Sequence, residues 1–154
     1  MDTLEYVLAD QPFLKGIPLD KLEEIAECAH PVTFSAGEYL FREGDPANHF
    51  YIVTRGRVSV EMHVPGKGAQ VIQTVDDNEV AGWSWLFPPF RWHFDGRAVT
   101  ATRAIDFNAL CLRGKCDEDH DLGYELMWRF AQTMMTRLQA TRMQLIEAYA
   151  DGHR

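Results

Sequence analysis

The chain has 154 residues, of which 46% are apolar and 25% charged, proportions typical of a single globular domain with a real core. Its formal net charge is -8. We therefore expect no direct binding of nucleic acid, because such binding depends on lysine and arginine that neutralise phosphates. No apolar run has the length of a membrane span, and the acidic N-terminus lacks the pattern of a signal peptide. These features predict a cytoplasmic protein without membrane contact.

The start of the chain predicts two short helices. Leu4–Ala9 and Leu19–Ala29 carry apolar residues at helical spacing on either side of a Lys-Gly-Ile-Pro break. Asp20 suits the positive end of the second helix dipole. We expect this helix to end at His30-Pro31, because a residue before proline resists the helical region.

From Val32 to Leu112 the apolar residues alternate in short runs separated by glycine turns. A period of two is typical of strands with one buried face. The predicted strands include Val71–Val75, Ala98–Thr102 and Ile105–Leu112. Short strands without intervening helices favour an antiparallel β-barrel of the jelly-roll or double-stranded β-helix type, mainly β with flanking helices.

The segment Leu122–Tyr149 predicts one long helix of about 40 Å at 1.5 Å per residue. Its apolar residues follow a 3-4 spacing that forms a seam: Met127, Ala131, Met134, Leu138, Thr141, Leu145 and Ala148. A seam of this length is more than one small barrel covers, so we expect it to join two copies in a homodimer. The alternative is that the helix packs entirely within its own chain.

These patterns predict a single domain over residues 1–154. Its expected parts are N-terminal helices at 1–30, a β-barrel at 31–113 that includes a loop at 80–99, and a C-terminal helical segment at 117–150. The loop holds three of the four tryptophans, and its Pro-Pro pair stops strand pairing. It is either a hydrophobic plug over the barrel or a ligand-binding turn that offers arginine and histidine side chains to an anion.

Two segments carry glycines at tight turns, where a side chain would be strained. They are Phe34–Asp45 (FSAGEYLFREGD) and Phe50–Val60 (FYIVTRGRVSV). On these motifs the chain resembles the cyclic nucleotide-binding domain family, found in catabolite activator proteins and in regulatory subunits of protein kinases. The resemblance extends from Phe13 to Tyr149 and implies a barrel fold with a regulatory, ligand-sensing function.

The resemblance implies that the tryptophan-rich loop corresponds to the family's phosphate cassette. In that cassette a Gly-Glu pair opens a short helix, the glutamate holds the ribose 2′-hydroxyl, and an arginine binds the cyclic phosphate. Gly82 matches the glycine, but Trp83 stands in the place of the glutamate. Counting back from the next strand puts the arginine position on Asp95. Arg97-Ala98 matches the family's Arg-Ala sequence but lies two residues further along the chain. A shift of two residues leaves the arginine on the same face of the strand.

These departures predict that cyclic AMP binds weakly or not at all. A carboxylate repels a phosphate, and an indole offers no acceptor to a ribose diol. Arg97, or Arg91 on the other limb of the loop, remains a candidate for a small anion because guanidinium is a fork of donors. The alternative is that the tryptophans fill the nucleotide cavity. The candidate ligand-binding residues are Gly82, Trp83, Ser84, Trp85, Arg91, His93, Arg97 and Ala98.

No group of residues has the spacing of a catalytic centre or a metal site. The histidines never form the His-x-His pattern of cupin-like metalloenzymes. His93 and Asp95 predict a structural hydrogen-bonded pair, and Cys111, Cys116 and His120 lack a fourth ligand. The odd number of cysteines without a CxxC pair predicts reduced thiols. We therefore expect no catalytic residue, no bound metal and no enzymatic activity.

The resemblance thus implies a regulatory domain that senses a cyclic nucleotide or another small anionic ligand. The family's transcription factors continue beyond the long helix into a winged helix-turn-helix, whereas this sequence ends at Asp151–Arg154. We expect a module without its own DNA-binding or catalytic output, which acts through an effector protein or a dimer. The alternative is a degenerate domain that binds no nucleotide and serves as an interaction module. A cupin-like metalloenzyme is the least favoured function.

Overall fold

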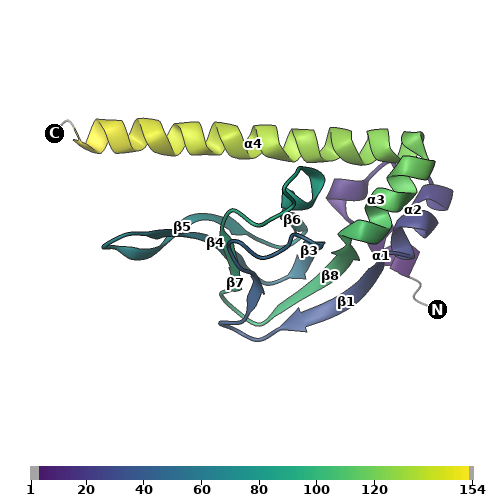
Figure 1. Cartoon of the computed structure of the whole chain (residues 1–154), viewed down its shortest axis with the longest axis horizontal. Coiled ribbons are helices and arrows are strands. Elements are labelled where there is room, and N and C mark those ends of the chain that lie inside the picture. The colour runs from purple at the N-terminus through teal and green to yellow at the C-terminus, as the bar shows by residue number, and fades with distance from the viewer. Residues whose placement is uncertain (1–3, 153–154) are drawn as a thin grey trace.

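The alternating segment between Ala29 and Asn108 forms eight strands in two antiparallel sheets, with helices on both sides of it in the chain (Figure 1). The structure is a computed structural model that describes residues 4–152. The helical elements are α1 (Leu4–Ala9), the 3-10 turn η1 (Pro12–Leu14), α2 (Leu19–Ala26), the 3-10 turn η2 (Ser84–Leu86), α3 (Ala109–Glu118) and α4 (His120–Gly152). The strands are β1 (Ala29–Phe34), β2 (Tyr39–Phe41), β3 (His49–Arg55), β4 (Val58–Val64), β5 (Gly68–Val75), β6 (Glu79–Ala81), β7 (Asp95–Ala98) and β8 (Thr102–Asn108).

The sheets have the strand orders β1-β8-β3-β6 and β2-β7-β4-β5, and every strand pair is antiparallel. The predicted antiparallel architecture with flanking helices and a C-terminal helix is confirmed. The predicted closed barrel is wrong. Within residues 4–152, no ladder joins an outer strand of one sheet to an outer strand of the other, so the strands stay in two separate sheets.

The second predicted helix is too long, because α2 ends at Ala26 and the chain then enters β1. His30 and Pro31 lie inside this strand rather than at a helix end. Proline is accepted there because β1 is an outer strand, paired only with β8. The strand pairing therefore outweighs the apolar spacing that suggested helix up to Ala29.

Two predicted strand boundaries also differ. Ala98–Thr102 spans the turn between β7 and β8 instead of forming one strand. Ile105–Leu112 is a strand only as far as Asn108, whose side-chain oxygen accepts a hydrogen bond from Cys111 N at 3.0 Å and caps α3. Asparagine is a preferred N-cap residue, because its side chain satisfies a backbone N–H that the helix leaves free. The C-terminal helical segment accordingly begins at Ala109, before the predicted position.

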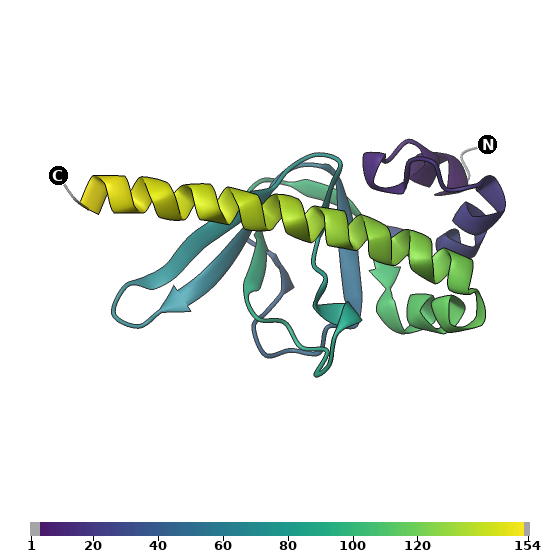
Figure 2. The same cartoon turned by 90° about the horizontal axis from the view of Figure 1, so that it is seen from above.

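The first three turns of α4 cover the core, and the rest of the helix runs on above the sheets in the direction of the β4–β5 hairpin (Figures 1 and 2). Leu122, Leu126 and Phe130 are fully buried. Beyond Phe130 no described residue of α4 is buried. The helix has 33 residues, about 50 Å at 1.5 Å per residue, and all its described residues from Leu138 onward are exposed.

A disulfide joins Cys28 to Cys111, and Cys116 is the free cysteine. The prediction of three reduced thiols is therefore wrong. The two cysteines are 83 residues apart, and they meet because Asn108 N donates a hydrogen bond to Cys28 O at 2.8 Å. Burial, helped by nearby carboxylates, raises the pKa of the Cys116 thiol to about 11. Cys116 is thereby a weak nucleophile at neutral pH.

We expect the unreduced protein to yield a single reactive thiol when it is denatured and titrated with a thiol reagent. Reduction should lower the free energy of unfolding by about 4 kcal/mol, since the disulfide restricts a long loop in the unfolded chain. Denaturant unfolding with and without reductant measures this loss. Cys116→Ser is the matched control and should show the same loss on reduction. Three reactive thiols in the unreduced protein would show that the disulfide does not form.

Candidate functional site

The loop that the sequence singled out begins at Gly82, directly after β6. Gly82 has φ +98°, in the left-handed region that favours glycine. A Cβ at this position would lie 2.4 Å from Cη2 of Trp92. Both the backbone turn and the indole that covers it therefore require glycine here.

Trp92 stacks on Phe41, with ring centroids 3.9 Å apart and planes within 13°. On the other side of the pair, a Cβ added to Gly96 of β7 would lie 2.4 Å from Cζ of Phe41. Both rings are buried. The space between Gly82 and Gly96 is thus filled by two aromatic side chains of the protein itself.

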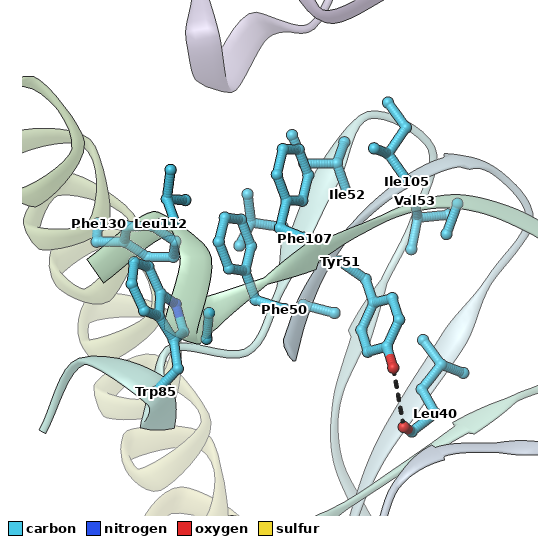
Figure 3. Close-up of a cluster of buried hydrophobic side chains, with 14 of the residues drawn as sticks. Leu40, Phe50, Tyr51, Ile52, Val53, Trp85, Ile105, Phe107, Leu112 and Phe130 are labelled. Atoms are coloured by element: carbon cyan, nitrogen blue, oxygen red, sulfur yellow. Dashed lines mark hydrogen bonds between the residues drawn. The ribbon is translucent and has the colours of Figure 1, made fainter. Parts of the chain in front are cut away.

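Ser84 and Trp85 lie in η2 and belong to the core. Trp85 stacks on Phe50 at 5.0 Å between ring centroids and meets Phe130 edge-on at 5.5 Å (Figure 3). Trp85 is 1% exposed, and its indole N–H has no hydrogen-bond partner among the described residues. A ligand in solution therefore has no access to it.

Trp83, which directly precedes η2, lies against a cation of the long helix. The guanidinium of Arg137 from α4 lies over the Trp83 ring, 5.8 Å from its centroid. Arg137 Nη2 also donates a hydrogen bond to Val80 O at 2.8 Å. Burial lowers the pKa of Arg137 below the usual arginine value. This contact joins the start of the loop to the long helix.

Arg91 and His93 are both exposed. Arg91 Nη1 donates a hydrogen bond to Gly44 O at 2.8 Å, and the Arg91 backbone forms an isolated bridge with Pro46. Arg91 thus fastens the loop to the turn between β2 and β3.

Arg97 lies on β7 opposite Ser59 of β4 and binds a buried carboxylate. Its Nε and Nη2 lie 3.2 and 3.0 Å from the same oxygen of Glu61. Ser59 Oγ donates a third hydrogen bond to that oxygen at 2.5 Å. Glu61 is 2% exposed, whereas the side chain of Arg97 is 44% exposed. The arginine that could meet an anion is therefore already paired within the protein.

Ala98 and Asp95, at the two ends of β7, have structural roles. Ala98 is buried, and its N–H donates to Glu38 O at 2.8 Å. The Asp95 carboxylate accepts a hydrogen bond from Glu43 N at 2.7 Å and lies 3.7 Å from Arg42 Nε. These are its bonding partners among the described residues, so the predicted hydrogen bond between His93 and Asp95 is not formed.

Nothing in the amino-acid pattern pointed to Glu61 and Ser59 as site residues. They alternate with Val58, Val60 and Met62 on β4, which is the usual pattern of a strand with a solvent-exposed polar face. Only the register between β4 and β7 puts them against Arg97. The other missed residue, Arg137, lies on an amphipathic helix where a cation normally faces water.

Among residues 4–152, no three histidine, cysteine, aspartate or glutamate side chains are placed to hold a metal ion. The same part of the chain has no helix that is both apolar and long enough to cross a bilayer. The candidate site consists of three features: the stacked rings of Phe41 and Trp92, the ion pair of Arg97 with Glu61, and the contact between Trp83 and Arg137.

Among known proteins, cGMP-dependent protein kinase 2 from Homo sapiens is 34% identical over 70 residues, which are 45% of this chain and 9% of the kinase. The CRP-like cAMP-activated global transcriptional regulator of Mycobacterium tuberculosis is 20% identical over 144 residues, which are 94% of this chain and 62% of the regulator. The chain thus spans less than two thirds of either relative.

A crystal structure of a putative cyclic nucleotide-binding protein from Geobacter metallireducens GS-15 has the same fold. The TM-score is 0.79, with 23% identity over 90% of this chain and 99% of that one. The profile of the family described as "Cyclic nucleotide-binding domain" matches residues 31–119, more than half of the chain. The chain belongs to the cyclic nucleotide-binding domain family.

Proposed function

We propose that this chain is a regulatory domain without catalytic activity, which responds to a small anionic ligand and acts through a second copy or an effector protein. We further propose that its cassette holds cyclic AMP and cyclic GMP weakly or not at all. The observation that carries the second part is the ion pair between Arg97 and the buried Glu61. The relatives named for cGMP and cAMP support the regulatory role.

Binding of a phosphate by Arg97 requires the guanidinium to leave Glu61. That carboxylate is 2% exposed and would keep only the hydrogen bond from Ser59. Removing one partner of a fully buried ion pair costs about 3–5 kcal/mol. Since Arg97 is 44% exposed, a cost of about 2 kcal/mol is reasonable, which weakens binding roughly 30-fold.

The ribose end of a nucleotide loses its usual acceptor as well. Trp83 replaces a carboxylate that would accept hydrogen bonds from the diol, and such charge-assisted bonds contribute about 1.5–3 kcal/mol each. Trp92 and Phe41 occupy the space between Gly82 and Gly96. Together with the cost at Glu61, these losses weaken binding by roughly three to four orders of magnitude.

We expect isothermal titration with cyclic AMP and with cyclic GMP to show no saturable binding below about 1 mM. Arg97→Ala should leave this result unchanged, and so should Arg103→Ala, an exposed arginine on β8. Low-micromolar binding that Arg97→Ala abolishes and Arg103→Ala preserves would contradict the proposal. It would show that Arg97 exchanges Glu61 for a phosphate.

Arg97→Met should lower the free energy of unfolding by about 2 kcal/mol, because it leaves the Glu61 carboxylate buried without its main partner. Glu61→Gln added to Arg97→Met should recover most of this loss, since it removes the buried charge. Urea unfolding of the two variants and the wild type gives the comparison. If the double variant is no more stable than Arg97→Met, the ion pair does not hold Arg97 in place.

The proposed action through a second copy rests on the apolar seam of α4. Met127, Leu138 and Leu145 are 45–58% exposed, although the seam they define is apolar. Phe130, beside the seam, is fully buried in its own chain, and Met134 of the seam packs partly against the same core, so the uncovered part of the seam lies mainly beyond Met134. An uncovered apolar stripe of this length is typical of an association surface. Its 3-4 spacing fits a second copy of the same helix as the occupant.

We expect the wild-type protein to sediment as a dimer at tens of micromolar. Leu138→Glu should shift it to a monomer, because the change puts a charge in the centre of the seam. Gln139→Glu adds the same charge on the neighbouring, outward face of α4 and should leave the dimer intact. A monomeric wild-type protein, or a dimer that survives Leu138→Glu, would remove the seam from the proposed mechanism.

A second candidate function is an interaction module that binds no small ligand at all. The buried pair of Phe41 and Trp92 favours it, since the pair leaves no room between Gly82 and Gly96.

The proposed location is the cytoplasm, and it rests on the sequence alone. The Cys28–Cys111 disulfide argues against this location, because cytosolic thiols are usually kept reduced.

A further inference from the structure

An open cleft of about 480 Å³ lies outside the cassette, between the N-terminal segment, the turn from β5 to β6, and α4. Pro12, Phe13 and Lys15 line it on one side, and Glu79 and Val80 on another. Its volume falls within the usual range of small-molecule sites. Of its lining residues only Val80 falls in the loop predicted at 80–99, and it lies in β6, before that loop leaves the sheet at Gly82.

Arg137 lines this cleft and lacks a carboxylate partner. Although burial lowers its pKa, no described carboxylate lies within 4.0 Å of its guanidinium. Its direct contacts are the hydrogen bond to Val80 O and the face of Trp83, while the Glu79 carboxylate acts on it only as a more distant charge. Charges removed from water are normally paired in proteins, so a partly buried guanidinium whose direct contacts are a carbonyl and a ring has room for an anionic partner.

Two further cations line the cleft. Arg129 is paired with Glu125 and donates to Lys15 O at 2.6 Å, so it holds the N-terminal segment against α4. The ammonium of Lys15 makes no ion pair with any described residue. Against these three cations stands one carboxylate, Glu79, which accepts a hydrogen bond from Asp76 N at 2.7 Å. The cleft is therefore positive, on a chain whose net charge is -8.

The remaining walls are apolar or neutral. Trp128 is 52% exposed at the cleft, and Phe13 packs partly buried against the core. An exposed indole beside unpaired cations suits a ligand with a flat apolar part and an oxyanion. We propose that this cleft binds a small organic anion of that class, with its phosphate or carboxylate at Arg137 and Lys15 and its flat part against Trp128.

The test uses phenyl phosphate and inorganic phosphate as probes, at constant ionic strength with chloride as the reference anion. Phenyl phosphate at about ten times its dissociation constant should raise the melting temperature by about 3–5 °C. Inorganic phosphate should bind at least about tenfold more weakly, because it lacks contact with Trp128. Trp128→Ala should remove this difference between the probes. No shift with phenyl phosphate, or equal affinities for the two probes, would overturn the proposal.

Arg137→Met should weaken the binding of phenyl phosphate at least about tenfold, as expected for the loss of a charge-assisted hydrogen bond. Arg142→Met is the matched control, because Arg142 is an exposed arginine on the same helix and outside the cleft. It should keep the wild-type affinity. An unchanged affinity in Arg137→Met would overturn the proposal, and a fall in Arg142→Met equal to that in Arg137→Met would do so as well.

Arg97→Met separates the cleft from the cassette. It should keep the response to phenyl phosphate, whereas loss of the response would place the anion at the cassette and overturn the proposal. The cyclic nucleotide titration depends on Arg97, and this experiment depends on Arg137. A failure of the proposed function at the loop is therefore distinguishable from a failure of the proposed anion site in the cleft.

Discussion

Packing around the ring of Phe50 connects the main parts of this molecule. The ring stacks on Phe107 at 4.4 Å and on Trp85 at 5.0 Å, and meets the edge of Phe130 at 5.2 Å (Figure 3). These four residues come from β3, β8, η2 and α4. Each aromatic pair adds about 0.5–1.5 kcal/mol beyond the burial of area. The cluster therefore fixes where the cassette begins and where α4 lies on the sheets, and both the loop and the cleft depend on it.

The features that sequence alone predicted are those with a local period. The helix Leu4–Ala9, the alternating strands and the long C-terminal helix follow from the spacing of apolar residues over a few turns. Features that join distant segments were missed. The Cys28–Cys111 disulfide, the two unclosed sheets and the pairing of Arg97 with Glu61 depend on strand register and helix placement. A single sequence carries no record of either, so Glu61 looked like an ordinary surface residue.

The two arginines of the site differ in what neutralises them. Arg97 is half exposed and has a buried carboxylate, so an incoming anion competes with Glu61. Arg137 is more deeply placed and has a carbonyl and an indole face, neither of which carries a full charge. An anion gains more at the second position, since no ion pair has to be broken there. We therefore expect the loop at 80–99 to be the less favourable of the two places for an anion on this chain.

The helix α4 also connects the cleft to the seam that we propose as the contact with a second copy. Arg137 and Leu138 are consecutive, so their side chains point about 100° apart around the helix axis. Arg137 reaches back to Val80 and Trp83, and Leu138 faces away, half exposed. A second copy seated on the seam would lie beside the cleft, and an anion held by Arg137 would fix the same helical turn that the second copy contacts. Under the proposed function, ligand and second copy would then stabilise one orientation of α4, and such a coupling between two sites is what an allosteric response requires.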